Sequence, residues 1–200
     1  MDWGKLNSRS LIETEIAMRR LFAAALVWFV MFSAVSRAEV IDAANGGFSL
    51  RHEVTIAAPR AEAWRAAVDE VGQWWSSDHT ISGDASNMSI DARPQGCFCE
   101  SLGDHAGVVH LTVTFANPQV LLRLTGGLGP LGLMGVDGNM LWEFLDADDG
   151  TIVKFSYAVG GYRAGGLDAL AEPVDFVIGE ALQRLKAHVE TGNADNISSD

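Results

Sequence analysis

The sequence predicts an α+β fold in which a curved antiparallel β-sheet wraps around one long C-terminal α-helix. Three observations predict it: a strand and a helix come first, a series of short β patterns separated by turns follows, and the last long segment has helical periodicity. A sheet and an amphipathic helix each have one apolar face. Packing these two faces together is the natural way to bury both.

The first 38 residues are predicted to be a secretory signal peptide. Two arginines at positions 19 and 20 precede an apolar run over 21–35, and the small residues within 36–38 suit a cleavage site before Glu39. The apolar run is about 15 residues long, shorter than the roughly 20 that cross a bilayer comfortably, so a retained anchor is the alternative. We therefore expect a periplasmic or secreted protein without stable membrane insertion after cleavage.

The start of translation is predicted to lie at Met18 rather than at Met1. Residues 1–17 contain Glu13 and Glu15, which suit the cationic start of an export signal poorly. A start at Met18 gives a compact signal with the sequence "MRRLFAAALVWFVMFSAVSRA".

The chain left after cleavage is expected to be one domain, 39–190, followed by a disordered acidic tail, 191–200. Cleavage removes five of the 14 basic residues and three of the 26 acidic residues, which leaves a formal charge of −14. This charge repels phosphate backbones and anionic lipid headgroups, so nucleic-acid binding is excluded.

The domain is predicted to begin with a strand over 48–58, because apolar and polar residues alternate there and place His52 on the inward face. Pro59 then suits the first position of a helix over 59–71. The polar, turn-rich segment that follows is expected to be a loop that leads to a second strand around 87–92.

Five further β patterns are predicted to form an antiparallel meander, at 96–102, 107–118, 120–127, 138–150 and 151–162. The segment 148–150 suits the hairpin turn between the last two. The glycine-rich segment 126–132 has no lysine and no strand-to-helix context, so it is interpreted as a flexible connection near a pocket rim and not as a phosphate loop. A final amphipathic helix is expected over 168–190, with Pro173 either in its first turn or between a short turn and the main helix.

Four segments of the chain together resemble the START-like, or SRPBCC, superfamily: "HEVTIAAPRAEAWRAAVDEVGQWW", "GCFCE", "LLRLTGGLGPL" and "YAVGGYRAGGLDALAEPVDFVIGEALQRLK". The resemblance covers residues 48–188 and is nearest to the polyketide cyclase/dehydrase and heat-shock ATPase activator-type branch. It implies the helix-grip fold, with a deep cavity between sheet and helix that relatives use for apolar ligands or for chemistry on them. The superfamily has no universal catalytic motif, so no catalytic residue, cofactor or metal is carried over.

Cys97 and Cys99 are separated by one residue in a predicted strand. This spacing is compatible with a disulfide, a metal site, a nucleophile, or buried thiols that line a cavity. Alternate residues of a strand share a face, and the two Cα atoms would be about 6.5 Å apart, near the upper limit for a disulfide. A disulfide therefore requires a distortion at Gly96. Cavity-lining thiols are the leading interpretation, because no motif supports zinc and no base lies on the same face.

A regular hairpin centred on His105 predicts which face these residues occupy. It pairs Glu100 with His110 on the polar, outward face and places both cysteines on the apolar, inward face. The supposed cluster of cysteines, acid and histidine would then be split between the two faces of the sheet.

Further candidate cavity residues come from the helix end, the loop and three strands. His52 is interpreted either as a hydrogen-bonded core residue or as a ligand contact or acid/base group. Trp74, Trp75 and His79 border the predicted cavity mouth. Either both tryptophans serve as core and lid packing, or one packs in the core and the other caps the entrance. Cavity-wall or core positions on the later strands are Trp142, Phe155 and Tyr157.

Three functions are compatible with this sequence. The first is an exported carrier or sensor that binds a small hydrophobic molecule between sheet and helix, with His52, Tyr157 or the thiols as orienting contacts. The second is a cyclase/dehydratase-type enzyme that uses His52 or Tyr157 as acid/base in the same cavity. The third is an interaction module whose core is filled by side chains.

Overall fold

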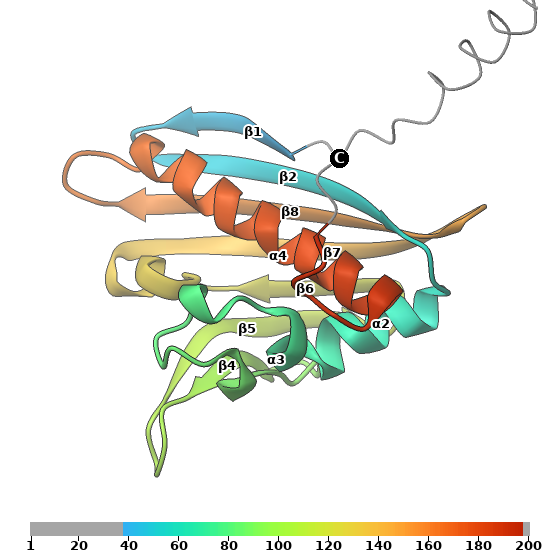
Figure 1. Cartoon of the computed structure of the whole chain (residues 1–200). Coiled ribbons are helices and arrows are strands. Elements are labelled where there is room, and N and C mark those ends of the chain that lie inside the picture. The colour runs from blue at the N-terminus through green and yellow to red at the C-terminus, as the bar shows by residue number, and fades with distance from the viewer. Residues whose placement is uncertain (1–37, 198–200) are drawn as a thin grey trace, which may run out of the picture. The chain divides into compact units, whose positions relative to one another are not determined.

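The computed structural model describes residues 38–197. They form an eight-stranded antiparallel sheet in the order β1-β2-β8-β7-β6-β5-β4-β3, and the long helix α4 lies across one face of it (Figure 1). The α+β fold with a curved sheet around the C-terminal helix is therefore confirmed. The Met18 start and the predicted signal peptide up to residue 37 lie outside the described residues.

The strands are β1 (Ala38–Ala44), β2 (Gly47–Ile56), β3 (Met88–Ile90), β4 (Cys97–Ser101), β5 (Gly107–Asn117), β6 (Leu121–Thr125), β7 (Gly135–Ala147) and β8 (Gly150–Tyr162). The α-helices are α2 (Arg60–Asp69), α3 (Val71–Trp74) and α4 (Ala171–Thr191). Short 3₁₀ helices are η1 (Ser77–His79), η2 (Ala85–Asn87), η3 (Gly129–Leu133) and η4 (Asp168–Leu170). None of these helices is long and apolar enough to span a bilayer.

The strand β1 was missed by the sequence analysis, which began the domain with the strand now labelled β2. A register shift between Val40 and Asp42 interrupts the two-residue alternation along β1. Three of its seven residues are alanines, which have a low β propensity, so no local pattern indicates a strand.

The predicted hairpin turn between β7 and β8 is confirmed, with Ala147 opposite Gly150. Gly150 has a φ of 140° and lies so close to the carbonyl oxygen of Ile56 that a Cβ atom would clash with it. Only glycine suits this position, where the hairpin meets the end of β2.

The helix α4 packs its apolar stripe, which includes Ile178, Leu182 and Leu185, against the sheet. It ends at Gly192, which adopts the left-handed conformation with a φ of 73°. Within the segment 191–200, predicted to be a disordered acidic tail, Ala194 is buried and Asp195 accepts a hydrogen bond from Arg184 at 2.7 Å.

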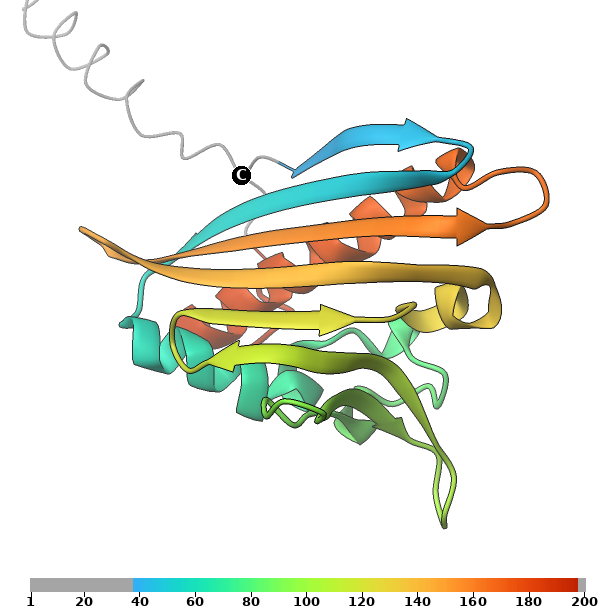
Figure 2. The same ribbon diagram turned by 180° about the vertical axis from the view of Figure 1, so that it is seen from behind.

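All described helices cover one face of the sheet, and Figure 2 shows the opposite face without a helix. The space between α4 and the middle of the sheet is filled by large buried side chains, among them Trp142, Phe144, Phe155 and Tyr157. These side chains occupy the middle of the interface, where the family resemblance implied a deep cavity. The available space lies toward one end of α4.

Candidate functional site

A β-bulge in β5 directs His110 into the interior. Phe98 pairs with Leu111, but Cys99 pairs with Val109, so His110 is an extra residue between these two pairs. Both His110 and Leu111 are buried, although successive residues of a regular strand point to opposite faces. The prediction that His110 faces outward is wrong, because it assumed a regular hairpin.

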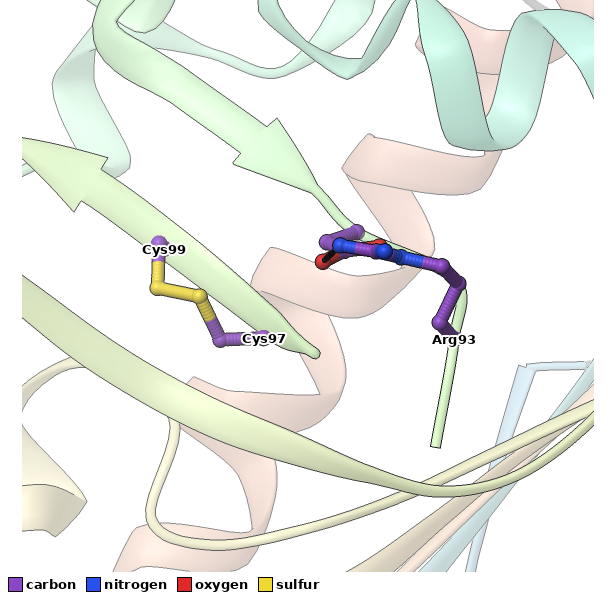
Figure 3. Close-up of a disulfide and its surroundings, with 4 residues drawn as sticks. Arg93, Cys97 and Cys99 are labelled. Atoms are coloured by element: carbon purple, nitrogen blue, oxygen red, sulfur yellow. Dashed lines mark hydrogen bonds and ion pairs between the residues drawn. A yellow bond between two sulfur atoms is a disulfide. The ribbon is translucent and has the colours of Figure 1, made fainter. Parts of the chain in front are cut away.

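The same register change reverses the predicted faces of β4. Phe98 and Glu100 are 2% and 1% exposed and point inward, whereas Cys97 and Cys99 are half-buried on the other face. The two cysteines form a disulfide with their Cα atoms 5.4 Å apart (Figure 3). The prediction of free, inward-facing thiols is therefore wrong, and the disulfide alternative describes this strand.

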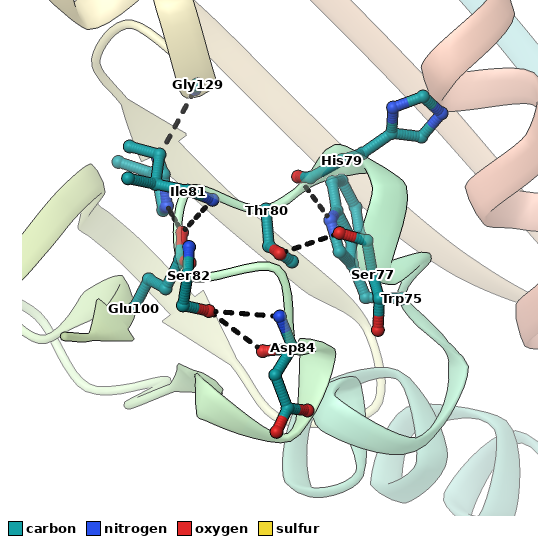
Figure 4. A network of polar contacts seen from close by, with 10 residues as sticks. Trp75, Ser77, His79, Thr80, Ile81, Ser82, Asp84, Glu100 and Gly129 are labelled. Carbon is teal, nitrogen blue, oxygen red and sulfur yellow. Dashed lines mark hydrogen bonds and ion pairs between the residues drawn. The ribbon is translucent and has the colours of Figure 1, made fainter. Parts of the chain in front are cut away.

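Glu100 and His110 form a buried pair beneath the loop that follows η1. The Oε2 atom of Glu100 lies 3.0 Å from Nε2 of His110, and both side chains are at most 3% exposed. The backbone N–H groups of Ile81 and Ser82 also donate to this carboxylate (Figure 4). The Nδ1 atom of His110 accepts a hydrogen bond from the Gly129 N–H at 3.3 Å, so the ring carries its proton on Nε2.

The carboxylate of Glu100 is held in its ionised form. Burial alone raises the pKa of this group, but the hydrogen bonds from Ser82, Ile81 and His110 outweigh burial and lower the pKa to about 2. A buried negative charge with three donors is thus fixed behind the imidazole of His110.

A cavity of about 320 Å³ lies in front of this pair. It is bounded by the segment around η1, by η3 and by the first half of α4, and His110 forms part of its wall. Most of the lining side chains are apolar: Trp75, Ile81, Met88, Leu128, Pro130, Leu131, Met134, Leu170, Pro173, Val174 and Val177. The volume suits a small organic molecule, and the wall offers few polar contacts.

Two of the predicted site residues, Trp75 and His79, line this cavity. The indole Nε1 of Trp75 donates to the carbonyl oxygen of His79 at 3.0 Å, and its ring makes an edge contact with Phe98. His79 pairs with Glu180 of α4 at 2.9 Å, which ties the η1 segment to the helix.

His52 lies in the core beneath α4 and does not line the cavity. Its Nε2 atom is 2.7 Å from Oδ1 of Asp175, and the absence of a side chain at Gly179 makes room for its ring. Burial lowers the pKa of His52, while the nearby carboxylate of Asp175 opposes this effect.

Trp74, Trp142 and Phe155 are buried and pack on one another instead of lining the cavity. The rings of Trp142 and Phe155 meet edge to face with their centroids 5.0 Å apart. The ring centroids of Trp74 and Trp142 are 6.3 Å apart. The Nε1 atom of Trp74 donates to the Ala66 carbonyl at 2.8 Å, so its polar group is satisfied within the core.

Tyr157 anchors the segment that forms one wall of the cavity. Its hydroxyl donates to the carbonyl of Gly126 at 2.7 Å and accepts from the N–H of Leu128 at 3.1 Å. Burial raises the pKa of Tyr157 to about 12, with the N–H of Leu128 acting in the opposite direction. The ring packs so closely on β7 that only glycine fits at Gly138.

The described residues contain no group of three or more histidine, cysteine, aspartate or glutamate side chains that could hold a metal ion. The polar side chains among the residues that line the cavity are those of Asp78, His79, Thr80 and His110.

Comparisons with known proteins identify the fold and no more. No family model matches the chain, and no curated protein matches it. A conserved protein of unknown function, EF2215 from Enterococcus faecalis, has a similar structure with a TM-score of 0.57 and 16% identity, over 82% of this chain and 83% of that one. CV1439 from Chromobacterium violaceum has a TM-score of 0.53 and 17% identity, over 71% of this chain and 96% of that one. The Aha1 dimer from Colwellia psychrerythraea has a TM-score of 0.52 and 15% identity, over 72% of this chain and 97% of that one.

Proposed function

We propose that this chain is an exported START-like domain that binds a small, largely apolar molecule in the cavity between η1, η3 and α4. The observation that carries the proposal is the cavity itself, with about 320 Å³ of space, an apolar lining and His110 in its wall. Removing apolar ligand surface from water contributes about 25 cal/mol per Å², so a small ligand that fills this space gains several kcal/mol.

The cavity favours ligand binding over an interaction module with a filled core. Aromatic side chains do fill the centre of the sheet–helix interface, but the first half of α4 leaves the gap beside Val174 and Val177 unfilled. The similar solved structures support the assignment to the START-like superfamily at the level of the fold.

One feature supports the proposal of export. Structural disulfides persist in oxidising compartments and are rare in the reducing cytosol, so the Cys97–Cys99 bond suits an exported protein. N-terminal sequencing of the processed protein tests this part, with Glu39 as the expected first residue and an uncleaved chain as the contrary result.

Ligand binding is tested by filling the cavity. The variant Val174→Phe places a larger side chain in the cavity wall, and Val109→Phe is the matched control, because Val109 is 62% exposed on β5. Native mass spectrometry of protein purified from its own host, followed by titration with a panel of small aromatic compounds, gives the readout. We expect a bound mass and probe binding in the wild type and the control, and a loss of at least about 10-fold in affinity in Val174→Phe. Equal binding by all three proteins would place the ligand elsewhere.

A further inference from the structure

We propose that His110 is a general base in this cavity, which takes a proton through Nδ1 from a small, mostly apolar carbon acid such as a carbonyl compound. Glu100 is its positioning residue. The inference rests on the proposed ligand-binding function and names the chemistry that the same cavity can perform.

Glu100 fixes the orientation and the tautomer of the His110 imidazole. Glu100 accepts the Nε2 proton of His110 at 3.0 Å, which leaves the lone pair on Nδ1. Nδ1 lies toward Gly129, which is also a cavity-lining residue. A carboxylate that fixes the tautomer of a histidine, and then stabilises the imidazolium that forms, is the arrangement by which proteins make imidazole an effective base.

The hydrogen bond at Nδ1 of His110 is weak. The distance of 3.3 Å to the Gly129 N–H exceeds the usual 2.7–3.2 Å of such hydrogen bonds, so a substrate can displace it at small cost. The freed N–H of Gly129 can then donate to the oxygen on which negative charge develops. One wall of the cavity thus offers an acceptor for the proton and a donor for the resulting anion.

The Glu100–His110 pair differs from the other histidine–carboxylate pairs of the described chain. His52 with Asp175, and His188 with Glu70, have short contacts but do not line the cavity. His79 does line it, but its side chain and that of its partner Glu180 are each 25% exposed. Within residues 38–197, Glu100 and His110 alone combine a fully buried carboxylate with a cavity-lining imidazole.

The reaction needs no other reactant. The C–H bond breaks, the proton goes to Nδ1, and the electron pair remains on the substrate as an enolate-type anion. The probe 5-nitrobenzisoxazole reports this step directly: its C3–H proton is removed, the electron pair forms the C≡N bond, the N–O bond breaks, and a coloured phenolate leaves. His110 then returns the proton to water.

The experiment compares wild type with His110→Gln, Glu100→Gln and the control His188→Gln, which removes a similar partly buried pair outside the cavity. Binding of the probe is measured by quenching of tryptophan fluorescence, and turnover by absorbance of the phenolate. We expect all folded proteins to bind the probe and His110→Gln to lose at least about 10-fold in rate. We expect the rate of His188→Gln to stay within about 2-fold of the wild-type rate.

The pH–rate profile of Glu100→Gln distinguishes a positioning role of Glu100 from a purely structural one. It should lower the rate and shift the half-maximal point of the pH–rate profile to lower pH, because glutamine cannot offset the charge of a protonated ring. Asp78 and His79, which also line the cavity, are unchanged in this comparison and contribute equally to both profiles. An unshifted profile would overturn the role of Glu100.

The outcomes distinguish the two proposals. A probe that binds but reacts equally fast with wild type and His110→Gln overturns the base and leaves ligand binding intact. A probe that does not bind counts against the proposed function as well. If His110→Gln and His110→Asn both fail to fold, benzoxazole is added to the wild type as a competitor of the probe, because it has no N–O bond to break. A lower rate then supports a base in the cavity, and an unaffected rate overturns it.

Discussion

Cys99 and Glu100 are consecutive residues of β4 that point to opposite faces of the sheet, so the disulfide lies directly behind the buried Glu100–His110 pair. Cys97 and Cys99 are half-buried on the helix-free face, whereas Glu100 is 1% exposed and points to the interior. Their strand, β4, is hydrogen-bonded to β3 on one side and to β5 on the other.

Breaking the disulfide should weaken the domain only slightly. The bond closes a loop with a sequence separation of two, for which the chain-entropy relation gives about 1.5 kcal/mol, less than for longer loops. We expect the double variant Cys97→Ser/Cys99→Ser to fold and to lose about that free energy of unfolding in urea titrations. A reducing agent should lower the stability of the wild type and leave the double variant unchanged; an unfolded double variant would contradict this expectation.

Glu100→Gln should destabilise the protein in a pH-dependent manner. The folded-state pKa of about 2 lies below the ordinary value of 4.5, so the ionised carboxylate stabilises the fold above about pH 4.5, and this contribution is lost as the pH falls toward 2. The difference corresponds to roughly 3 kcal/mol at pH 7. Unfolding titrations at several pH values should show the gap between wild type and variant closing in acid, whereas a constant gap would indicate a purely steric effect.

Tyr157→Phe should loosen the cavity wall without any effect of tyrosine ionisation. It removes both hydrogen bonds to the 126–128 segment and leaves the buried N–H of Leu128 and the partly buried carbonyl of Gly126 without these partners, which costs about 1–3 kcal/mol. Since the pKa of Tyr157 is about 12, the loss should be the same from pH 6 to pH 9. Tyr162→Phe is the control, because Tyr162 is 78% exposed and should change the melting temperature little.

In mild acid, the His52→Gln variant should lose less of its free energy of unfolding than the wild type does. Burial lowers the pKa of His52 below 6.5, so the unfolded chain binds a proton more readily than the folded one. The stabilising contribution is complete above pH 6.5 and is lost as the pH falls through the folded-state pKa. Urea titrations between pH 8 and pH 5 should show a shallower decline in the variant than in the wild type, and His105→Gln, in an exposed turn, should follow the wild type.

The sequence alone determined the order of the elements and the pairing of most strands. Alternation along β2, β7 and β8 and the helical stripe of α4 are local patterns, and the helix begins and ends within a few residues of the predicted range. The hairpin at 148–150 and the connection at 126–132 beside the cavity also follow from local turn chemistry. The strand β1 was not predicted, because its residues show no local β pattern.

Tertiary structure decided the site. One extra residue in β5 reverses the facing of β4 relative to a regular hairpin, and no local pattern marks His110 as that residue. The location of the cavity depends on how the aromatic side chains of the sheet fill the space below α4, which is a property of the whole packed interior. Residue types and periodicity therefore give the framework, whereas the groups that share the cavity wall are set by register and by packing between segments distant in sequence.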